Sequence, residues 1–343
     1  MEPVRIVNAA VVHPQHQVAQ DDAVEYIARL GGDRRRLGAL ARGAGIASRY
    51  VSLPPEALAT LDRIEARNAR YREIAPSLSV RSAAMAMGEC DPADIGCVAT
   101  SSCTGYMLPG WSVDIVDGLG LQPGTARTPV TEAGCAGGVV ALSRAVDHLR
   151  FRQGAAALVV ATELCSLALQ RSHDEGNLAA SLLFGDGSGA CLLASGAGPG
   201  LTIIDAASAL LPGTRHLLGF DLTDHGFFPV LRRELVEQLV PAAVTAAEAL
   251  LQRHGLRPED VAAWLLHPGG ARILAGIERR AGLVRSQTRW SWDSLEHCGN
   301  MSSVAVIDVI RRYLDDDAAP GGYGIVAAFG PGVSIELLLV RRD

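Results

Sequence analysis

Cys135 is the residue of this chain best placed to act as a nucleophile. It follows a β-like run, lies between Gly134 and Gly137, and precedes an amphipathic helical pattern. Glycines permit a sharp strand-to-helix turn and a close approach by a substrate. The unpaired N–H groups and the positive dipole end of a helix favour a thiolate over a thiol. We therefore predict that Cys135 carries an acyl group, although a lone cysteine is more often a buried structural residue.

His267 is the candidate partner of this thiolate. It ends an apolar strand and is followed by Pro268, Gly269 and Gly270, which break the strand before a helix that begins near Ala271. The carboxyl end of a strand faces the crevice where α/β proteins bind ligands. A histidine there can hold a thiolate as an ion pair and donate a hydrogen bond to a thioester carbonyl. The simpler interpretation is a hydrogen-bonded core histidine.

Asn300 is the third candidate, because its amide can donate a hydrogen bond to an enolate or oxyanion while it stays uncharged. It also precedes a helical pattern, and taken alone it is typical of a helix N-cap. Its position in an internal repeat favours a functional role. Pro92 lies 43 positions before Cys135, and Pro258 lies 42 positions before Asn300. The two loops therefore occupy equivalent places and are expected to face each other.

The elements that must position these residues alternate between strands and helices. The order predicts a gene-duplicated α/β protein with two βαβαβ halves, residues 1–198 carrying Cys135 and residues 199–343 carrying His267 and Asn300. A short Gly/Pro-rich stretch at 195–200 marks the seam. The predicted strands span 95–99, 128–132, 156–162, 261–266 and 323–328, and the predicted helices span 108–118, 136–150, 234–254 and 302–314.

Four short motifs follow one another in this chain: GCAG at 134–137, HPGG at 267–270, GNMSS at 299–303 and FGPG at 329–332. Together they resemble the type III polyketide synthases, the chalcone synthase-like family of the thiolase superfamily, in its bacterial branch. The resemblance implies a thiolase-like fold in an αβαβα arrangement. It implies decarboxylative condensation of an acyl-CoA starter with malonyl-CoA on Cys135, with His267 and Asn300 decarboxylating malonyl-CoA and stabilising the enolate, and then cyclisation to a pyrone, a resorcinol or a related aromatic product.

The same resemblance assigns roles around the substrate. Phe184 and Phe228 match the two gatekeeper phenylalanines, with Phe227 one register away from the second. Cys103 matches a cavity wall position and Leu108 a loop that touches the partner's cavity in the family's dimer. The arginines of an N-terminal helix match the region that binds CoA phosphates. The substrate-binding residues expected are Phe184, Phe228, Cys103, Leu108, Gly269, Gly330, Pro331, Ser302, Arg36 and Arg42.

Composition restricts the partners. The net charge is −6, and all 31 basic residues other than histidine are arginine, so no global positive field favours nucleic acid or an anionic membrane. No run reaches the roughly 18 apolar residues of a membrane span, and no secretion signal is recognisable. The seven cysteines lack metal-site spacing. We expect a cytoplasmic homodimer that uses acyl-CoA and malonyl-CoA, with no metal and no cofactor beyond these thioesters.

Three other classes of protein are alternatives to a type III polyketide synthase. The order Cys, His, Asn also occurs in papain-like proteases, but here the cysteine lies deep in a repeated α/β pattern. A ketoacyl-ACP synthase III shares the fold and the three residues, while HPGG and FGPG favour the polyketide branch. A noncatalytic scaffold of the same fold is the alternative from another class. Segment 162–167 resembles bacterial enzymes that make alkylpyrones, which favours a fatty acyl starter.

Overall fold

The structure is a computed structural model, which describes residues 2–151, 156–168 and 174–343. Its main element is a nine-stranded mixed sheet in the order β11-β12-β13-β8-β1-β7-β6-β4-β5. The strands of this sheet are β1 (Val4–Val12), β4 (Ile95–Ser101), β5 (Ala126–Val130), β6 (Ala156–Leu164), β7 (Asp186–Ser195), β8 (Leu201–Leu210), β11 (Val261–Leu266), β12 (Gly322–Gly330) and β13 (Ser334–Arg342). Two small sheets pair β2 (His16–Ala19) with β3 (Ser48–Val51) and β9 (Leu218–Thr223) with β10 (Gly226–Leu231).

The large sheet consists of two limbs. Strands β1 and β8 join through only three residue pairs, Val4 to Ile6 with Ile203 to Leu201. On one side the order is β1-β7-β6-β4, and on the other it is β8-β13-β12-β11. The pairs β6–β4 and β12–β11 are both parallel, while β6–β7 and β12–β13 are both antiparallel. The predicted duplication is therefore confirmed, with β5 as an extra strand of the first limb.

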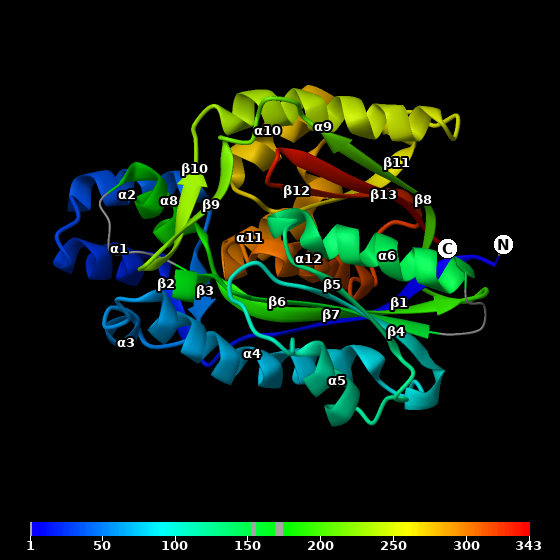
Figure 1. Cartoon of the computed structure of the whole chain (residues 1–343). Coiled ribbons are helices and arrows are strands. Elements are labelled where there is room, and N and C mark those ends of the chain that lie inside the picture. The colour runs from blue at the N-terminus through cyan, green and yellow to red at the C-terminus, as the bar shows by residue number, and fades with distance from the viewer. Residues whose placement is uncertain (1, 152–155, 169–173) are drawn as a thin grey trace.

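Helices form three layers around the two limbs (Figure 1). Helix α4 (Ile64–Met87), with α5 (Ser112–Gly118) beside it, covers the outer face of the first limb. Helices α6 (Gly137–Phe151) and α12 (Ala305–Leu314) lie between the limbs. Helix α9 (Leu235–Gln252), with α10 (Ala271–Ala281) beside it, covers the second limb. The αβαβα arrangement of a thiolase-like fold is thus confirmed.

The remaining elements lie at the ends of these layers. Helix α11 (Arg285–Cys298) packs on β11. The 3-10 turns η1 (Pro92–Asp94) and η3 (Pro258–Asp260) lead into β4 and β11, so the repeat holds at this level too. The others are η2 (Gly134–Ala136) and η4 (Ser302–Val304). Five helices complete the list: α1 (Gln20–Arg29), α2 (Arg34–Ala44), α3 (Pro55–Leu58), α7 (Cys165–Ala168) and α8 (Glu175–Leu183).

The buried position of the central elements explains their sequences. Every residue of β6 is buried, because helices cover both faces of the first limb, and the strand is accordingly an almost unbroken apolar run. Helix α12 is buried on all sides from Ala305 to Ile310, as expected for a helix between two sheets. At the start of α6, a Cβ on Gly138 would collide with the carbonyl oxygen of Ser303. Glycine at this position lets the two halves approach each other closely.

The predicted elements agree with the structure except at some ends. The helix predicted from 108 begins at Ser112, because Leu108 precedes a proline and is disfavoured from helical geometry. The helix predicted from 302 begins as η4 and becomes α-helical at Ala305. The domain boundary at 198 and 199 falls between β7 and β8 and stays a prediction, since both limbs share one central core. No helix among the described residues is long and apolar enough to cross a membrane.

Candidate active site

Cys135 lies in η2, between β5 and α6, on the wall of a cavity of about 870 Å³. Gly134 before it has a φ of +52°, and a Cβ there would lie 2.6 Å from Cδ of Pro331. Both the backbone conformation and the close contact require glycine. The turn therefore depends on two loops of the chain, one from each half.

Asn300 lies on the loop between α11 and η4, and η4 packs against η2 as the repeat predicted. Its side-chain oxygen accepts a hydrogen bond from the backbone N–H of Ser302 at 2.8 Å. The side-chain nitrogen is therefore the donor, and it lies 3.5 Å from the Gly269 carbonyl oxygen. The same amide lowers the pKa of the Cys135 thiol.

His267 follows β11 and is 1% exposed. Its backbone N–H donates to the Ala327 carbonyl at 2.7 Å, and its carbonyl accepts from the Gly269 N–H at 2.8 Å. Its Nδ1 has no hydrogen-bond partner in the described part of the chain. Burial lowers the pKa of His267 to about 3, which makes the resting imidazole neutral. Gly269, the contact of Asn300, thus also holds the backbone of His267.

The protonation of Cys135 differs from the sequence-based expectation. Burial raises the pKa of its thiol to about 12, and the charge of Glu163 raises it further. Hydrogen bonds from Ser302 and Asn300 oppose this shift without cancelling it. The helix end alone is therefore insufficient to form the thiolate. Because burial disfavours both thiolate and imidazolium, a Cys135–His267 ion pair would have to form by one coupled proton exchange.

Glu163 is a buried acid at this site that the sequence-based interpretation missed. Its carboxylate accepts hydrogen bonds from Ser303 Oγ at 2.6 Å, Thr104 Oγ1 at 2.9 Å, the Cys103 backbone N–H at 3.1 Å and Ser302 Oγ at 3.2 Å. Burial raises its pKa, and these donors lower it in part. A glutamate inside the otherwise apolar β6 was a signal that could have identified it, because charged residues are rarely buried without partners.

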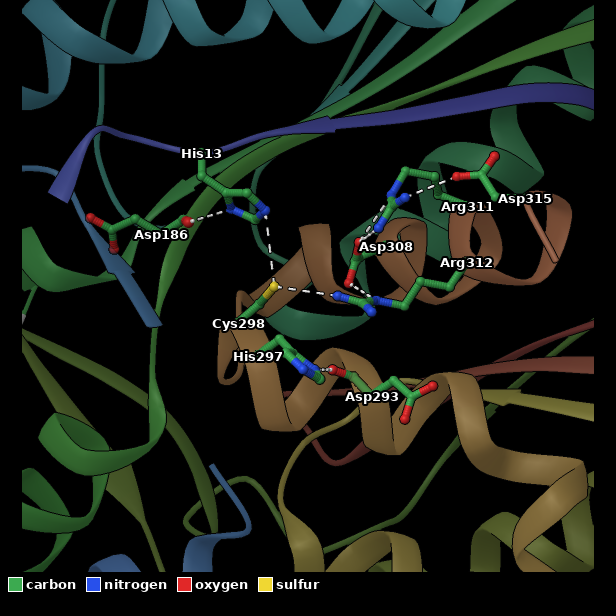
Figure 2. A network of polar contacts seen from close by, with 9 residues as sticks. All are labelled: His13, Asp186, Asp293, His297, Cys298, Asp308, Arg311, Arg312 and Asp315. Atoms are coloured by element: carbon green, nitrogen blue, oxygen red, sulfur yellow. Dashed lines mark hydrogen bonds and ion pairs between the residues drawn. The ribbon is translucent and has the colours of Figure 1, made fainter. Parts of the chain in front are cut away.

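A second polar network holds the Asn300 loop from behind (Figure 2). Cys298, the last residue of α11, lies 3.9 Å from Nε2 of His13 and accepts a hydrogen bond from Arg312 at 3.7 Å. Arg312 in turn forms an ion pair with the fully buried Asp308 at 2.7 Å. Cys298 lies two positions before Asn300 in the chain. Its contacts with His13 and Arg312 therefore restrict the movement of the Asn300 loop.

The FGPG and GNMSS motifs form the remaining wall. A Cβ on Gly330 would collide with the carbonyl oxygen of Ala133, so this glycine permits the approach of the loop to the Cys135 turn. Pro331 and Ser302 both line the cavity. Ser302 has a φ of +50°, a conformation that non-glycine residues rarely adopt. The four motifs thus meet at one place in the fold.

Comparison with known proteins identifies this arrangement. The family model described as the N-terminal domain of chalcone and stilbene synthases matches residues 4–199, and the model of their C-terminal domain matches residues 186–342. The chain belongs to the chalcone and stilbene synthase family. It is a type III polyketide synthase, an acyl-transferring enzyme of the thiolase fold. The alternatives of a ketoacyl-ACP synthase III and of a noncatalytic scaffold are therefore wrong.

Individual relatives of this synthase cover nearly its whole length. It is 34% identical to 1,3,6,8-tetrahydroxynaphthalene synthase from Streptomyces peucetius subsp. caesius, over 97% of this chain and 93% of that protein. It is 29% identical to phloroglucinol synthase from Pseudomonas fluorescens, over 95% and 96%. The crystal structure of tetrahydroxynaphthalene synthase from Streptomyces coelicolor superposes with a TM-score of 0.91 at 28% identity, covering 99% of each chain.

The two predicted gatekeepers of the synthase lie in different cavities. Phe184 lines the Cys135 cavity, as predicted. Phe228 does not line it among the described residues, and lies instead in a neighbouring cavity of about 680 Å³ with Gly269. Phe227 is the phenylalanine of β10 that lines the Cys135 cavity, where it packs against Phe220. Successive strand residues point to opposite faces, so β10 forms a wall between the two cavities.

The arginines predicted to bind CoA lie on α2, a helix that borders the neighbouring cavity through Leu40 and Gly43. Arg36 and Arg42 are exposed on α2, and neither belongs to the described lining of these two cavities. The neighbouring cavity is lined instead by Arg232, Arg233 and Arg272. The sequence-based interpretation did not single out these three, and its assignment of phosphate binding to Arg36 and Arg42 stays a prediction.

The predicted dimer loop of the synthase is only partly exposed. Leu108 is 81% exposed and Tyr106 is 66% exposed. Trp111, which was expected to be exposed with them, is 5% exposed, and its indole N–H donates to the Tyr71 hydroxyl at 3.0 Å. The indole can be buried with Tyr71 in one apolar cluster because its polar N–H finds a partner there. The exposed apolar patch is therefore smaller than predicted and centres on Leu108.

Proposed function

We propose that this synthase condenses an acyl-CoA starter with malonyl-CoA units in the 870 Å³ cavity, and that Cys135 carries the growing chain. The observation that supports this most directly is the position of Cys135 on the wall of that cavity, beside an Asn300 amide that lowers the pKa of its thiol. A nucleophile and an uncharged donor next to each other are what acyl transfer followed by enolate chemistry requires. Cys103, Phe184 and Ser302 line the same cavity and shape the space for the chain.

Acylation comes first. Cys135 transfers its proton to His267, and the thiolate attacks the thioester carbonyl of the starter. The tetrahedral intermediate collapses, the C–S bond to CoA breaks, and the proton leaves with the CoA thiol. His267, now protonated, donates a hydrogen bond to the oxyanion as it forms. Acyl transfer then leaves both buried groups neutral, the state that their burial favours.

Condensation follows on the same residues. Malonyl-CoA binds with its thioester oxygen between Asn300 and His267, loses carbon dioxide, and leaves an enolate whose negative oxygen both side chains stabilise. The enolate carbon attacks the acyl group on Cys135. One C–C bond forms, the C–S bond to Cys135 breaks, and the chain leaves as a CoA thioester two carbons longer. Repetition of these steps and cyclisation complete the product.

The neighbouring 680 Å³ cavity is the proposed path of CoA. Arg232, Arg233 and Arg272 line it, and guanidinium groups bind phosphates in bidentate geometry. Gly269 lies in the same cavity, beside His267 and Asn300, so a pantetheine arm could reach the reacting centre along this side of β10. Phe228, on this face of the strand, keeps the proposed gatekeeper role at the CoA side. No cofactor beyond the thioesters is proposed.

For the starter we propose a fatty acyl group and for the product a pyrone or resorcinol. One relative, 30% identical over 96% of this chain, is named alpha-pyrone synthesis polyketide synthase-like Pks18 and comes from Mycobacterium tuberculosis. A naphthalene product is the second candidate. It is favoured by the 34% identity to a tetrahydroxynaphthalene synthase and by Cys103 Sγ, which lies 3.5 Å from Ser302 Oγ in the cavity.

Incubation with labelled malonyl-CoA and a panel of acyl-CoAs, followed by mass spectrometry of products, tests the proposal. We expect labelled polyketides from the wild type and neither product nor acyl-enzyme from Cys135→Ala. A thioester adduct on the Cys135→Ala protein, seen by intact mass, would contradict the assignment. A labelled product without added starter would select the naphthalene candidate over the fatty acyl one.

We also propose a cytoplasmic homodimer. All seven cysteines are free thiols in the structure, which supports a reducing compartment. The exposed Leu108 supports a partner subunit, since an apolar side chain held out on a short loop favours burial at an interface.

A further inference from the structure

A groove of about 710 Å³ lies on the surface between α9 and α10, with Trp292 of α11 at its side. Val236, Ala271 and Arg272 line both this groove and the 680 Å³ cavity, so the two spaces adjoin. The condensation chemistry derived above uses the cavity and leaves the groove unused. The groove is therefore an outer surface directly beside the proposed path of CoA.

Three arginines of α10 give this groove its charge. Arg272, Arg279 and Arg280 all line it, and all three are exposed. They are seven and eight positions apart, which is about two turns of helix, so they lie on one face of α10. None of their side chains forms an ion pair with another residue in the described part of the chain. Glu237 is the only acid in the described lining of the groove.

The neighbouring arginine of α11, in contrast, is engaged within the chain. Arg285 pairs with Glu278 at 3.0 Å, and its guanidinium lies 3.7 Å from the centre of the Trp292 ring. Glu278 also accepts a hydrogen bond from the Trp292 indole at 2.7 Å. The acid of α10 is thus occupied by α11. Uncompensated cations gathered on one face of a chain whose net charge is −6 favour a local acidic partner.

The deeper lining of the groove is apolar. Val240 and Gly276 are buried there, Ala275 is half-buried, and the arginines are exposed at the rim. A Cβ on Gly276 would lie 2.8 Å from Cγ2 of Val240, so α9 and α10 are in close contact at this point. An apolar floor with a charged rim is suited to an amphipathic helix, whose apolar side lies on the floor while its charged side faces the rim.

We propose that this groove docks an acidic carrier protein that delivers an acyl starter to Cys135 on a phosphopantetheine arm. A helix of the carrier lies along α10 against Arg279 and Arg280, and the arm enters the 680 Å³ cavity past Arg272. The C–S bond between the acyl group and the arm breaks, a C–S bond to Cys135 forms, and the Cys135 proton leaves with the thiol of the arm. The carrier is a second donor beside CoA, and this step rests on the proposed function only in taking Cys135 as the acceptor.

The place of the groove favours a carrier over other anionic partners. Coenzyme A and the carrier arm end in the same pantetheine thiol, so the cavity that adjoins the groove suits both donors. A nucleic acid is a poorer match, because three arginines neutralise few phosphates and an apolar floor offers nothing to a phosphate backbone. The charge and the position of the groove therefore point to the same partner.

Calorimetric titration of the full-length protein with an acidic acyl carrier protein, its phosphopantetheine thiol free, tests docking without any condensation. We expect saturable binding at low salt that weakens at least about tenfold when Arg279→Glu and Arg280→Glu are combined, because like charges then face each other. The pair Arg72→Glu and Arg81→Glu, at exposed positions of α4, changes the net charge equally and should bind as the wild type does. Absence of saturable binding, or an equal loss in both double variants, would overturn the proposal.

Delivery is tested by product formation from malonyl-CoA with decanoyl carrier protein or with decanoyl-CoA. The combined Arg279→Glu and Arg280→Glu variant should lower kcat/KM for the decanoyl carrier by about tenfold or more and leave kcat/KM for decanoyl-CoA unchanged. An equal loss with both donors would refute the docking role of the groove. Intact carrier binding without product from either donor would instead contradict the proposed condensation, so the two failures are distinguishable.

Discussion

Phe184 and Asn300 are joined by an isolated parallel β-bridge, in which the Asn300 N–H donates to the Leu183 carbonyl at 2.9 Å and the Gly185 N–H donates to the Asn300 carbonyl at 3.0 Å. A side chain on the cavity wall and a proposed catalytic amide are therefore held by one pair of backbone hydrogen bonds. Any shift of the α8 end moves both. Changes in the shape of the cavity and in the position of the enolate donor should accompany each other.

Asn300→Ala should separate loading from extension. Acylation of Cys135 is expected to continue, because the thiol and His267 remain. Decarboxylation of malonyl-CoA should fall by about 10²–10³, as expected for the loss of an oxyanion donor. Release of labelled carbon dioxide measures the loss, and intact mass after incubation with the starter confirms loading. Carbon dioxide release at the wild-type rate would refute the role of Asn300.

His267→Ala should move the reactivity of Cys135 to higher pH. Burial raises the pKa of this thiol to about 12, and His267 is the proposed group that accepts its proton. Without that acceptor, the thiolate fraction falls tenfold for each unit of pH below the thiol pKa, so alkylation by iodoacetamide near pH 7 should slow by at least about tenfold. His254→Ala, which removes a surface histidine paired with Asp205, is the matched control. Superimposable pH profiles for wild type and His267→Ala would contradict the pair.

Gly134→Ala tests whether the Cys135 turn needs glycine for space as well as for conformation. Gly134 and Gly120 have φ values of +52° and +63°, but only Gly134 has a neighbour, Pro331, where a Cβ would lie. Gly120→Ala should lower the free energy of unfolding by about 1 kcal/mol through backbone strain alone. Gly134→Ala should lower it by about 1–3 kcal/mol more through overpacking, and should also slow acylation. Equal denaturant midpoints for the two variants would show that space is not limiting.

Arg272→Ala should weaken recognition of CoA, and Arg36→Ala should not. Loss of one phosphate contact is expected to raise KM for malonyl-CoA by about tenfold with kcat little changed. The KM for a malonyl thioester of N-acetylcysteamine, which has no phosphate, should be the same in wild type and Arg272→Ala. The reverse ranking, with Arg36→Ala the impaired variant, would restore the original assignment to α2.

Leu108→Asp tests the dimer. An aspartate in place of an exposed leucine should be harmless to a monomer, but it would bury an unpaired charge in an interface. We expect the variant to sediment with a larger monomer fraction and to lose condensation activity. Val284, 61% exposed just before α11, gives the control Val284→Asp. A fully active Leu108→Asp monomer would rule out a contribution of this loop to the partner's cavity.

Much of the site could be predicted from the sequence, because local residue patterns indicate both the duplication and the order of the strands. The nearly equal spacing from Pro92 to Cys135 and from Pro258 to Asn300 predicted that η2 and η4 meet, and they do. The burial of β6 and the start of α10 at Ala271 follow from hydrophobic runs and a Pro-Gly-Gly break in the same direct way. These features depend on neighbours along the chain.

Features that depend on three-dimensional packing could not be predicted in this way. Neighbouring residues of a strand point to opposite faces, so either Phe227 or Phe228 faces the Cys135 cavity. Which one does so depends on the register of β10, and the sequence does not determine that register. The proton affinity of Cys135 follows from its burial, which outweighs the helix end next to it. For the phenylalanines of β10 and for Cys135, the sequence identified the residues but not their surroundings in the fold.

The helices between the two limbs have a consequence for the origin of the protein. Helices α6 and α12 face sheets on both sides, and one half alone would leave such a helix with an apolar side in water. A precursor with a single βαβαβ unit could have been stable only when two copies joined face to face. In that pair the turns that now carry Cys135 and Asn300, each just before a central helix, were the same segment in two identical chains. Fusion of the genes released each copy to specialise, one toward nucleophile and the other toward amide donor.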